Sequence, residues 1–332
     1  MNLSFKLAVK YLILLTIGFG ILYLAFKGQD LKQIWAEIKH ADFYWVFISA
    51  SCVFIANILR ALRWRMLYRS INYNVGFWST FHALIIGYLA NLALPRFGEI
   101  ARCSVLLRSN KIPLSSSIGT VVTERLLDVA VLLLMGVLIL LFQYNLVFDF
   151  LYQTIYLSLI DRLQTVNYYV LAAICFAIII GGFFIISFLK SKINKKFLRI
   201  FVGLKQGINS VTKVKSKTLF TFYTVGIWTF YFLSMYTCFF SIASTQNLGF
   251  SVAFTALVFS SFAMVAPVQG GIGIFHWMVA KALVLYSIPF NEGLTYATII
   301  HSAQVLITLL LGTISLITVL TKKSEGNVNI SK

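Results

Sequence analysis

The stretch NLALPRFGEIARC, residues 91–103, breaks an apolar run at Pro95. Three charged residues follow within about two helical turns: Arg96, Glu99 and Arg102. A charged side chain at the centre of a membrane-spanning helix costs about 2.5–3.5 kcal/mol on insertion scales. The stretch therefore either lies outside a membrane or belongs to a polar site inside one, and the rest of the chain decides between the two.

The composition of the chain is that of a membrane protein. Hydrophobic residues make up 59% of the 332 residues and charged residues only 11%, whereas soluble domains carry about 25% charge. We therefore expect an all-α, polytopic membrane protein. The net charge of +18 does not indicate nucleic-acid binding, because the basic residues lie between apolar runs, as in cytoplasmic loops. The four cysteines are scattered, and we expect neither a metal nor a cofactor.

Six apolar stretches are long enough to cross a membrane; they are residues 7–26, 43–62, 118–142, 169–189, 219–242 and 294–320. Basic residues flank them unevenly, with a run of lysines within 190–217 and a basic group after the second stretch that comprises Arg60, Arg63, Arg65 and Arg69. The positive-inside rule then predicts that both termini are cytoplasmic and that the protein lies in the cytoplasmic membrane.

Two further apolar segments are interrupted by proline. Segments 75–117 and 251–293 each begin and end on the same side of the membrane by the charge count. We expect each to be a re-entrant hairpin of two half-helices, the first of which breaks at Pro95, where its second half-helix begins. The alternative is that every half crosses fully, but residues 96–110 are too short and too charged to do so.

This order of spans and hairpins predicts an inverted repeat. The expected divisions are a first repeat at 1–142, an external connection at 143–168, a second repeat at 169–320 and a cytoplasmic tail at 321–332. Within the second repeat, residues 190–217 form a basic amphipathic segment suited to an anionic membrane surface. The hairpin tips PRFGEI (95–100) and PVQGGI (267–272) share Pro-x-x-Gly. Inverted repeats with broken helices are typical of transporters, whose substrate site lies where the breaks meet.

Charged residues at membrane depth are the strongest site signal. In TVVTERLLDVAVLLL (120–134), Glu124 and Asp128 share one helical face, with Arg125 beside them. Unpaired, these residues together with Glu99 and Arg102 would cost on the order of 10 kcal/mol. They must be paired or face a wet cavity. One reading is a structural ion-pair cluster, and the other is a role with substrate or protons.

The hairpin tips supply the remaining candidates. A helix terminus within the membrane is a ready anion site, and the glycines of the second tip either let a ligand approach the backbone or merely form a tight turn. The candidate substrate-binding residues are Pro95, Arg96, Gly98, Glu99, Arg102, Glu124, Arg125, Asp128, Gln269, Gly270, Gly271, Gly273 and His276. No catalytic residue is assigned.

Three motifs together resemble the lysylphosphatidylglycerol synthase transmembrane-region family: NLALPRFGEIARCSVLLRS (91–109), SSIGTVVTERLLDVAVLLL (116–134) and APVQGGIGIFHWMVAKALVLY (266–286). The resemblance implies a flippase-like membrane region that handles lipids. Bifunctional members add a soluble aminoacyl transferase, which we expect this chain to lack because it stops soon after its last span. We therefore do not expect it to be an enzyme. Many relatives carry a glutamate near the position of His276.

These observations predict a flippase-like transporter of an anionic, phosphate-bearing lipid. The alternatives are an integral membrane transferase acting on a lipid phosphate and a scaffold without transport. The expected partners are membrane lipids with anionic headgroups and not nucleic acid. A second copy of the chain and a separate lipid-synthesising enzyme are further candidate partners.

Overall fold

The computed structural model describes residues 31–144 and 211–321, together with positions 23, 26–28, 148 and 152. Every regular element in these ranges is a helix, as expected for an all-α membrane protein. Several expected segments fall wholly or largely outside the described residues: spans 7–26 and 169–189, connection 143–168, the basic segment 190–217 and the tail 321–332.

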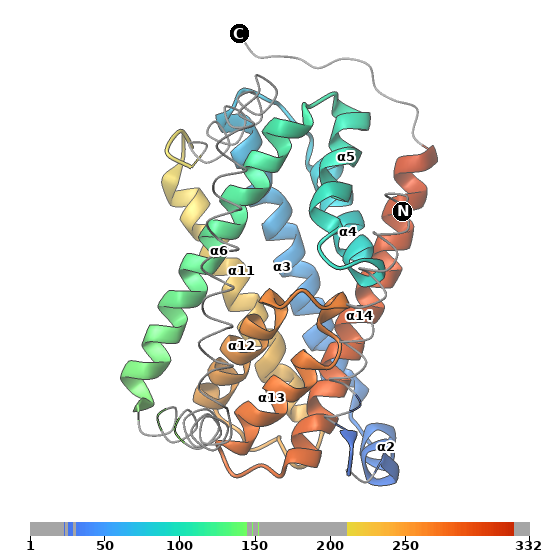
Figure 1. Ribbon diagram of the computed structural model, residues 1–332, viewed down its shortest axis with the longest axis vertical. Coiled ribbons are helices and arrows are strands. Elements are labelled where there is room, and N and C mark those ends of the chain that lie inside the picture. Colours follow the sequence, from blue (N-terminus) through green and yellow to red (C-terminus); the bar gives the residue numbers. More distant parts are fainter. Residues whose placement is uncertain are drawn as a thin grey trace, which may run out of the picture.

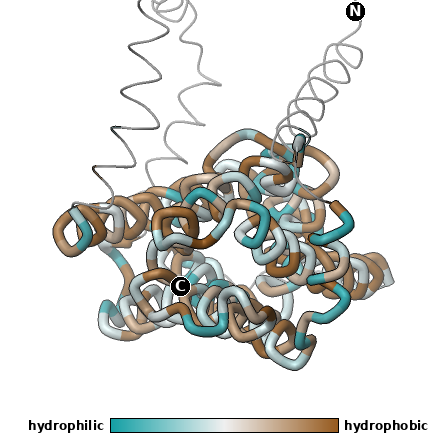
Figure 2. Tube along the Cα trace, turned by 90° about the horizontal axis from the view of Figure 1, so that it is seen from below, coloured by the Kyte–Doolittle hydropathy of each residue, from teal (hydrophilic) through white to brown (hydrophobic). Residues whose placement is uncertain are grey.

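Four long helices are apolar enough to cross a membrane. They are α3 (Phe43–Ser70), α6 (Leu114–Phe142), α11 (Lys217–Cys238) and α14 (Phe290–Thr321). In Figure 1 they run along most of the length of the bundle. Seen along that length, apolar residues predominate at the left and right edges of the bundle (Figure 2). The structure thus places helices at the four expected spans that it describes.

Two pairs of short helices lie between the long ones. The first pair is α4 (Phe77–Ala93) with α5 (Gly98–Asn110), and the second is α12 (Phe250–Val265) with α13 (Ile274–Val284). With 11 to 17 residues each, none reaches a hydrocarbon thickness of about 30 Å. In Figure 1 the two pairs occupy opposite halves of the bundle, and their turns face each other at mid-height. A short helix, α2 (Leu31–Lys39), lies near one end.

Proline ends the first helix of each pair by the same mechanism. The residue before a proline is sterically biased away from the helical conformation. Leu94 is accordingly extended (φ −137°, ψ 121°) before Pro95. Ala266 is likewise non-helical (φ −62°, ψ 143°) before Pro267. Both predicted breaks therefore lie where the sequence indicates.

The expectation that Pro95 begins the second half-helix is wrong. Helix α5 begins three residues later, at Gly98. The physical reason is the turn itself, because Arg96 adopts a positive φ of 58° and reverses the chain before helical geometry resumes. Glu99 nevertheless lies in the first turn of α5, where the helix dipole favours a negative charge.

Helices α4 and α5 approach each other closely at two glycines. A Cβ atom on Gly98 would lie 2.0 Å from the carbonyl oxygen of Gly87. The N–H of Gly98 donates to Asn91 Oδ1 at 2.7 Å, which satisfies one of the free donors at the start of α5. The hairpin is thus a tightly packed unit.

The basic group that was expected after the second span is not a loop. Helix α3 continues to Ser70, so all four arginines lie inside it, and Arg60 and Arg63 are buried. The expectation that all four arginines of this group follow the span is therefore wrong. The reason is that long arginine side chains on an inward face can be paired within the bundle rather than exposed to water.

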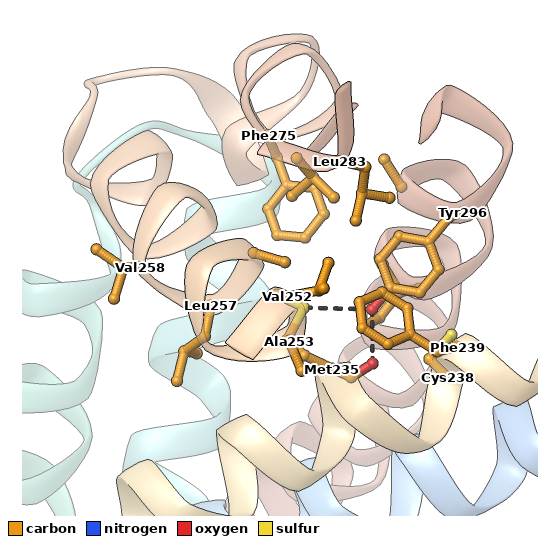
Figure 3. Close-up of a cluster of buried hydrophobic side chains, with 14 of the residues drawn as sticks. Met235, Cys238, Phe239, Val252, Ala253, Leu257, Val258, Phe275, Leu283 and Tyr296 are labelled. Atoms are coloured by element: carbon orange, nitrogen blue, oxygen red, sulfur yellow. Dashed lines mark hydrogen bonds between the residues drawn. The ribbon is translucent and has the colours of Figure 1, made fainter. Parts of the chain in front are cut away.

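Two large hydrophobic clusters among the described residues stabilise the bundle. One lies among α3, α4, α5 and the start of α6, with Trp64 and Leu84 fully buried. The other joins α11, α12, α13 and α14 (Figure 3). In this second cluster the rings of Phe239 and Tyr296 are 4.8 Å apart. The Tyr296 hydroxyl donates to the carbonyl of Met235 at 2.7 Å, so its buried polar atom is satisfied.

Candidate functional site

Glu124 is the centre of a buried ion-pair network between α3, α5 and α6. Its side chain is 1% exposed. One carboxylate oxygen accepts from Arg60 Nε at 2.8 Å, and the other accepts from Arg102 Nη1 at 2.8 Å. Arg63 Nη2 lies 3.9 Å from the first oxygen. One acid therefore contacts three arginines from two different helices.

Asp128 completes the network one turn further along α6. One of its oxygens accepts from Arg63 Nη2 at 2.7 Å, and the other accepts from Arg60 Nη2. Its side chain is 14% exposed. The predicted shared face of Glu124 and Asp128 is thus the face that meets α3.

The sequence reasoning missed two members of this network, Arg60 and Arg63. The charge pattern of the sequence groups both with the basic residues that follow the second apolar stretch. A signal was available: the two residues are three apart, so on a continuing helix they share a face with each other and not with Arg65 or Arg69. Arg60 also donates from Nη1 to the Tyr231 hydroxyl at 3.1 Å, which ties α3 to α11.

The buried network carries more positive than negative charge. In the part of the chain that the structure describes, its three arginines, Arg60, Arg63 and Arg102, face two carboxylates. Several buried donors also have no acceptor among the described residues; they are Nε and Nη2 of Arg102, Nε of Arg63 and the Tyr88 hydroxyl. The Trp64 ring partly compensates the positive charge of Arg102, whose Cζ atom lies 4.6 Å from the ring centroid. Among the described residues, the network therefore has an excess of positive charge and several buried donors without an acceptor.

A second ion pair lies beside the network and is more accessible. Arg125 Nη2 donates to Glu99 Oε1 at 2.9 Å. The two side chains are 43% and 29% exposed, respectively. The surrounding surface is apolar, because Leu126 and Val129 of α6 are both largely exposed. This pair marks where the charged region meets the outer surface of the bundle.

The two hairpin tips bind each other reciprocally. Arg96 Nη2 donates to the carbonyl of Val265, the last residue of α12. Gln269 Nε2 donates to the carbonyl of Ala93, the last residue of α4, at 2.9 Å. Each tip thus satisfies a carbonyl at the end of the other pair's first helix. These carbonyls have no partner within their own helix.

The remaining candidates shape the second tip. Gly270, Gly271 and Gly273 all have positive φ, between 55° and 83°, so glycine is required there by the turn. The carbonyl of Gly270 accepts from His301 Nε2 at 2.8 Å. His276 is buried with its ring 4.8 Å from that of His301.

The structure therefore separates the candidates into three sets. Glu99, Arg102, Glu124, Arg125 and Asp128 come together. Gln269, Gly270, Gly271 and Gly273 lie in the second tip, and His276 follows in the first turn of α13. Pro95, Arg96 and Gly98 belong to the first tip and the start of α5. Within the described ranges, no hydrogen bond or ion pair joins the second tip to the charged network. Nor do these ranges contain a group of three or more metal-ligating side chains.

Comparisons with known proteins identify relatives of the chain. The sequence profile of the family described as "Lysylphosphatidylglycerol synthase TM region" matches residues 9–312. The UPF0104 membrane protein MJ1595 of Methanocaldococcus jannaschii is 25% identical over 127 residues, which cover 37% of this chain and 38% of that protein. The matched part is thus well under half the length of this relative. No solved structure matches the chain significantly.

Proposed function

The chain belongs to the family of the lysylphosphatidylglycerol synthase transmembrane region, and from this premise we propose that it is a flippase-like transporter. Its substrate is an anionic, phosphate-bearing lipid whose headgroup passes through the charged network. The family match and the long apolar helices place the protein in a membrane as a multi-pass chain. The transport step is the part that we propose.

The observation that carries the proposal is the excess of buried positive charge around Glu124. Arginine presents paired donors that match the oxygens of phosphate. A buried charge without a partner is costly, so an anion that fills the position stabilises the network. The donors without acceptors on Arg102 and Arg63 supply hydrogen bonds for such an anion.

The surroundings of the network favour a lipid over a soluble anion. The half-exposed pair of Glu99 and Arg125 opens beside Leu126 and Val129, which are 55% and 44% exposed. Exposed leucine and valine on a membrane-spanning helix face hydrocarbon rather than water. A headgroup would therefore enter sideways from the membrane, with its acyl chains remaining in lipid.

The arrangement of the hairpins supports passage across the membrane. The order of one long, two short and one long helix occurs twice, in α3–α6 and α11–α14. We propose that the two halves form an inverted repeat whose hairpins enter from opposite faces. In transporters of this architecture, substrate is bound near the midplane between the repeats. In this topology the protein lies in the cytoplasmic membrane, and both termini are on its cytoplasmic side.

The pairing of the carboxylates favours binding over group transfer. All four oxygens of Glu124 and Asp128 accept from an arginine. A general base needs a lone pair directed at the proton that it removes, and these acids direct theirs at guanidinium groups. We therefore rank a transporter above a membrane transferase acting on a lipid phosphate.

The test is reconstitution into vesicles at matched folded amounts. Headgroup-labelled phosphatidylglycerol is followed between leaflets, with labelled phosphatidylcholine as the zwitterionic control. We expect the wild type to move the anionic lipid. Asp128→Asn and Glu99→Gln should both change that rate, whereas Glu292→Gln, at the start of α14, should not.

Normal transport by both Asp128→Asn and Glu99→Gln would leave these acids as structural pairs. A wild type no faster than empty vesicles for either lipid would contradict transport of these lipids and favour the scaffold.

A further inference from the structure

We propose that the charged network selects lipids by the charge of the phosphate and takes a phosphodiester, which carries one negative charge, in preference to a doubly charged phosphomonoester. This inference rests on the proposed function, because it concerns the same site and names the substrate class. It follows from a count of charges that are all held in the interior of the bundle.

The side chains of the network are well buried. Arg60, Arg63 and Arg102 are 10%, 0% and 3% exposed, whereas Glu124 and Asp128 are 1% and 14% exposed. Among the described residues, three positive charges against two negative charges leave an excess of one. The neighbouring pair of Glu99 and Arg125 is neutral in sum.

An excess of one charge favours a ligand of one charge. In a medium of low dielectric, an uncompensated charge is far more costly than a paired one. A phosphodiester keeps a single negative charge and brings the network to neutrality. A phosphomonoester has a second pKa of about 6 and carries about −1.5 to −2 at pH 7. Binding it would replace a positive excess with a negative one.

The position of the free donors locates the phosphate on Arg102. Its Nη1 is occupied by Glu124, while Nε and Nη2 have no acceptor among the described residues. Nε and Nη2 form the side edge of the guanidinium, which binds two oxygens of one phosphate in parallel. The Tyr88 hydroxyl is also buried without a partner.

The first experiment needs no substitution. The purified full chain in zwitterionic detergent is titrated with phosphatidylglycerol, phosphatidic acid or phosphatidylcholine, and the lipid concentration that stabilises it against heat is measured. At pH 8, where phosphatidic acid is doubly charged, phosphatidylglycerol should act at roughly a tenfold lower concentration, which corresponds to about 1.4 kcal/mol. At pH 5 phosphatidic acid regains its proton, and the two anionic lipids should act alike. Equal action at pH 8 would overturn the inference.

Substitutions that change the charge count should change the preference. Asp128→Asn raises the excess to two, and we expect the preference for phosphatidylglycerol at pH 8 to fall by roughly tenfold or reverse. Arg63→Gln removes the excess and should abolish the preference for anionic lipids. Glu292→Gln is the control outside the network. An unchanged preference in folded Asp128→Asn would refute charge matching, and the wild-type pH comparison decides the matter if the variants fail to fold.

Further outcomes separate this inference from the proposed function. A wild type that moves phosphatidylglycerol between leaflets but binds phosphatidic acid equally well at pH 8 would refute charge matching alone. A wild type that selects phosphatidylglycerol but moves no lipid would refute transport alone. Dimethyl phosphate is a soluble phosphodiester that lacks acyl chains. If it stabilised the protein as effectively as the lipid, the ligand would be a soluble anion rather than a lipid.

Discussion

Replacing Glu124 by glutamine should destabilise the protein more than any other neutralisation in the network. Glu124 contacts three arginines and is 1% exposed. Without its charge, Arg102 has no carboxylate partner among the described residues. Stranding one member of a buried ion pair costs about 3–5 kcal/mol. At about 2–4 °C per kcal/mol for chains of a few hundred residues, Tm should fall on the order of 10 °C.

The assay is thermal unfolding of purified protein in detergent, with Glu99→Gln as the matched control. Glu99 is the same residue type in a single, more exposed pair, and such pairs contribute about 0–1 kcal/mol. Its loss should therefore shift Tm by no more than about 4 °C. If Glu124→Gln melted like the wild type, or if both variants lost the same stability, the network would not be the buried cluster described above.

Two further predictions concern the hairpin and the orientation of the chain. Gly98→Ala should prevent normal folding, because its methyl group would meet a backbone carbonyl of α4 at 2.0 Å, whereas Gly76→Ala faces open space and should fold; size-exclusion profiles of the two proteins distinguish the outcomes. Cysteines replacing Arg69 and Lys111 should both react with an impermeant thiol reagent from the cytoplasm, and one replacing Asn291 should react only from outside; external labelling at position 111 would contradict a re-entrant first hairpin.

The elements that follow from local chemistry could be predicted from the sequence. The helix breaks at Pro95 and Pro267 depend only on the sterics of the residue before each proline. The shared face of Glu124 and Asp128 depends only on helical periodicity. Both features depend on residues that are close together in the sequence, and the structure shows both.

The elements that depend on distant partners could not be predicted in this way. The charge pattern groups Arg60 and Arg63 with the residues after the second span, since it does not reveal that two acids on α6 pair with them. The observed start of α5 differs from the predicted one because the chain reverses at Arg96 in place of a helical turn. The reciprocal bonds between the tips join residues that lie far apart in the sequence, at equivalent positions of the two hairpins.

Those reciprocal bonds have a consequence for how the protein is made. As the chain emerges from the ribosome, the first hairpin is synthesised long before Val265 and Gln269 exist, so the Ala93 carbonyl lacks its eventual donor and Arg96 its eventual acceptor. An unsatisfied polar group in hydrocarbon is costly. The first hairpin thus acquires these two contacts only after the second one has been made. A chain that is interrupted between them lacks both bonds.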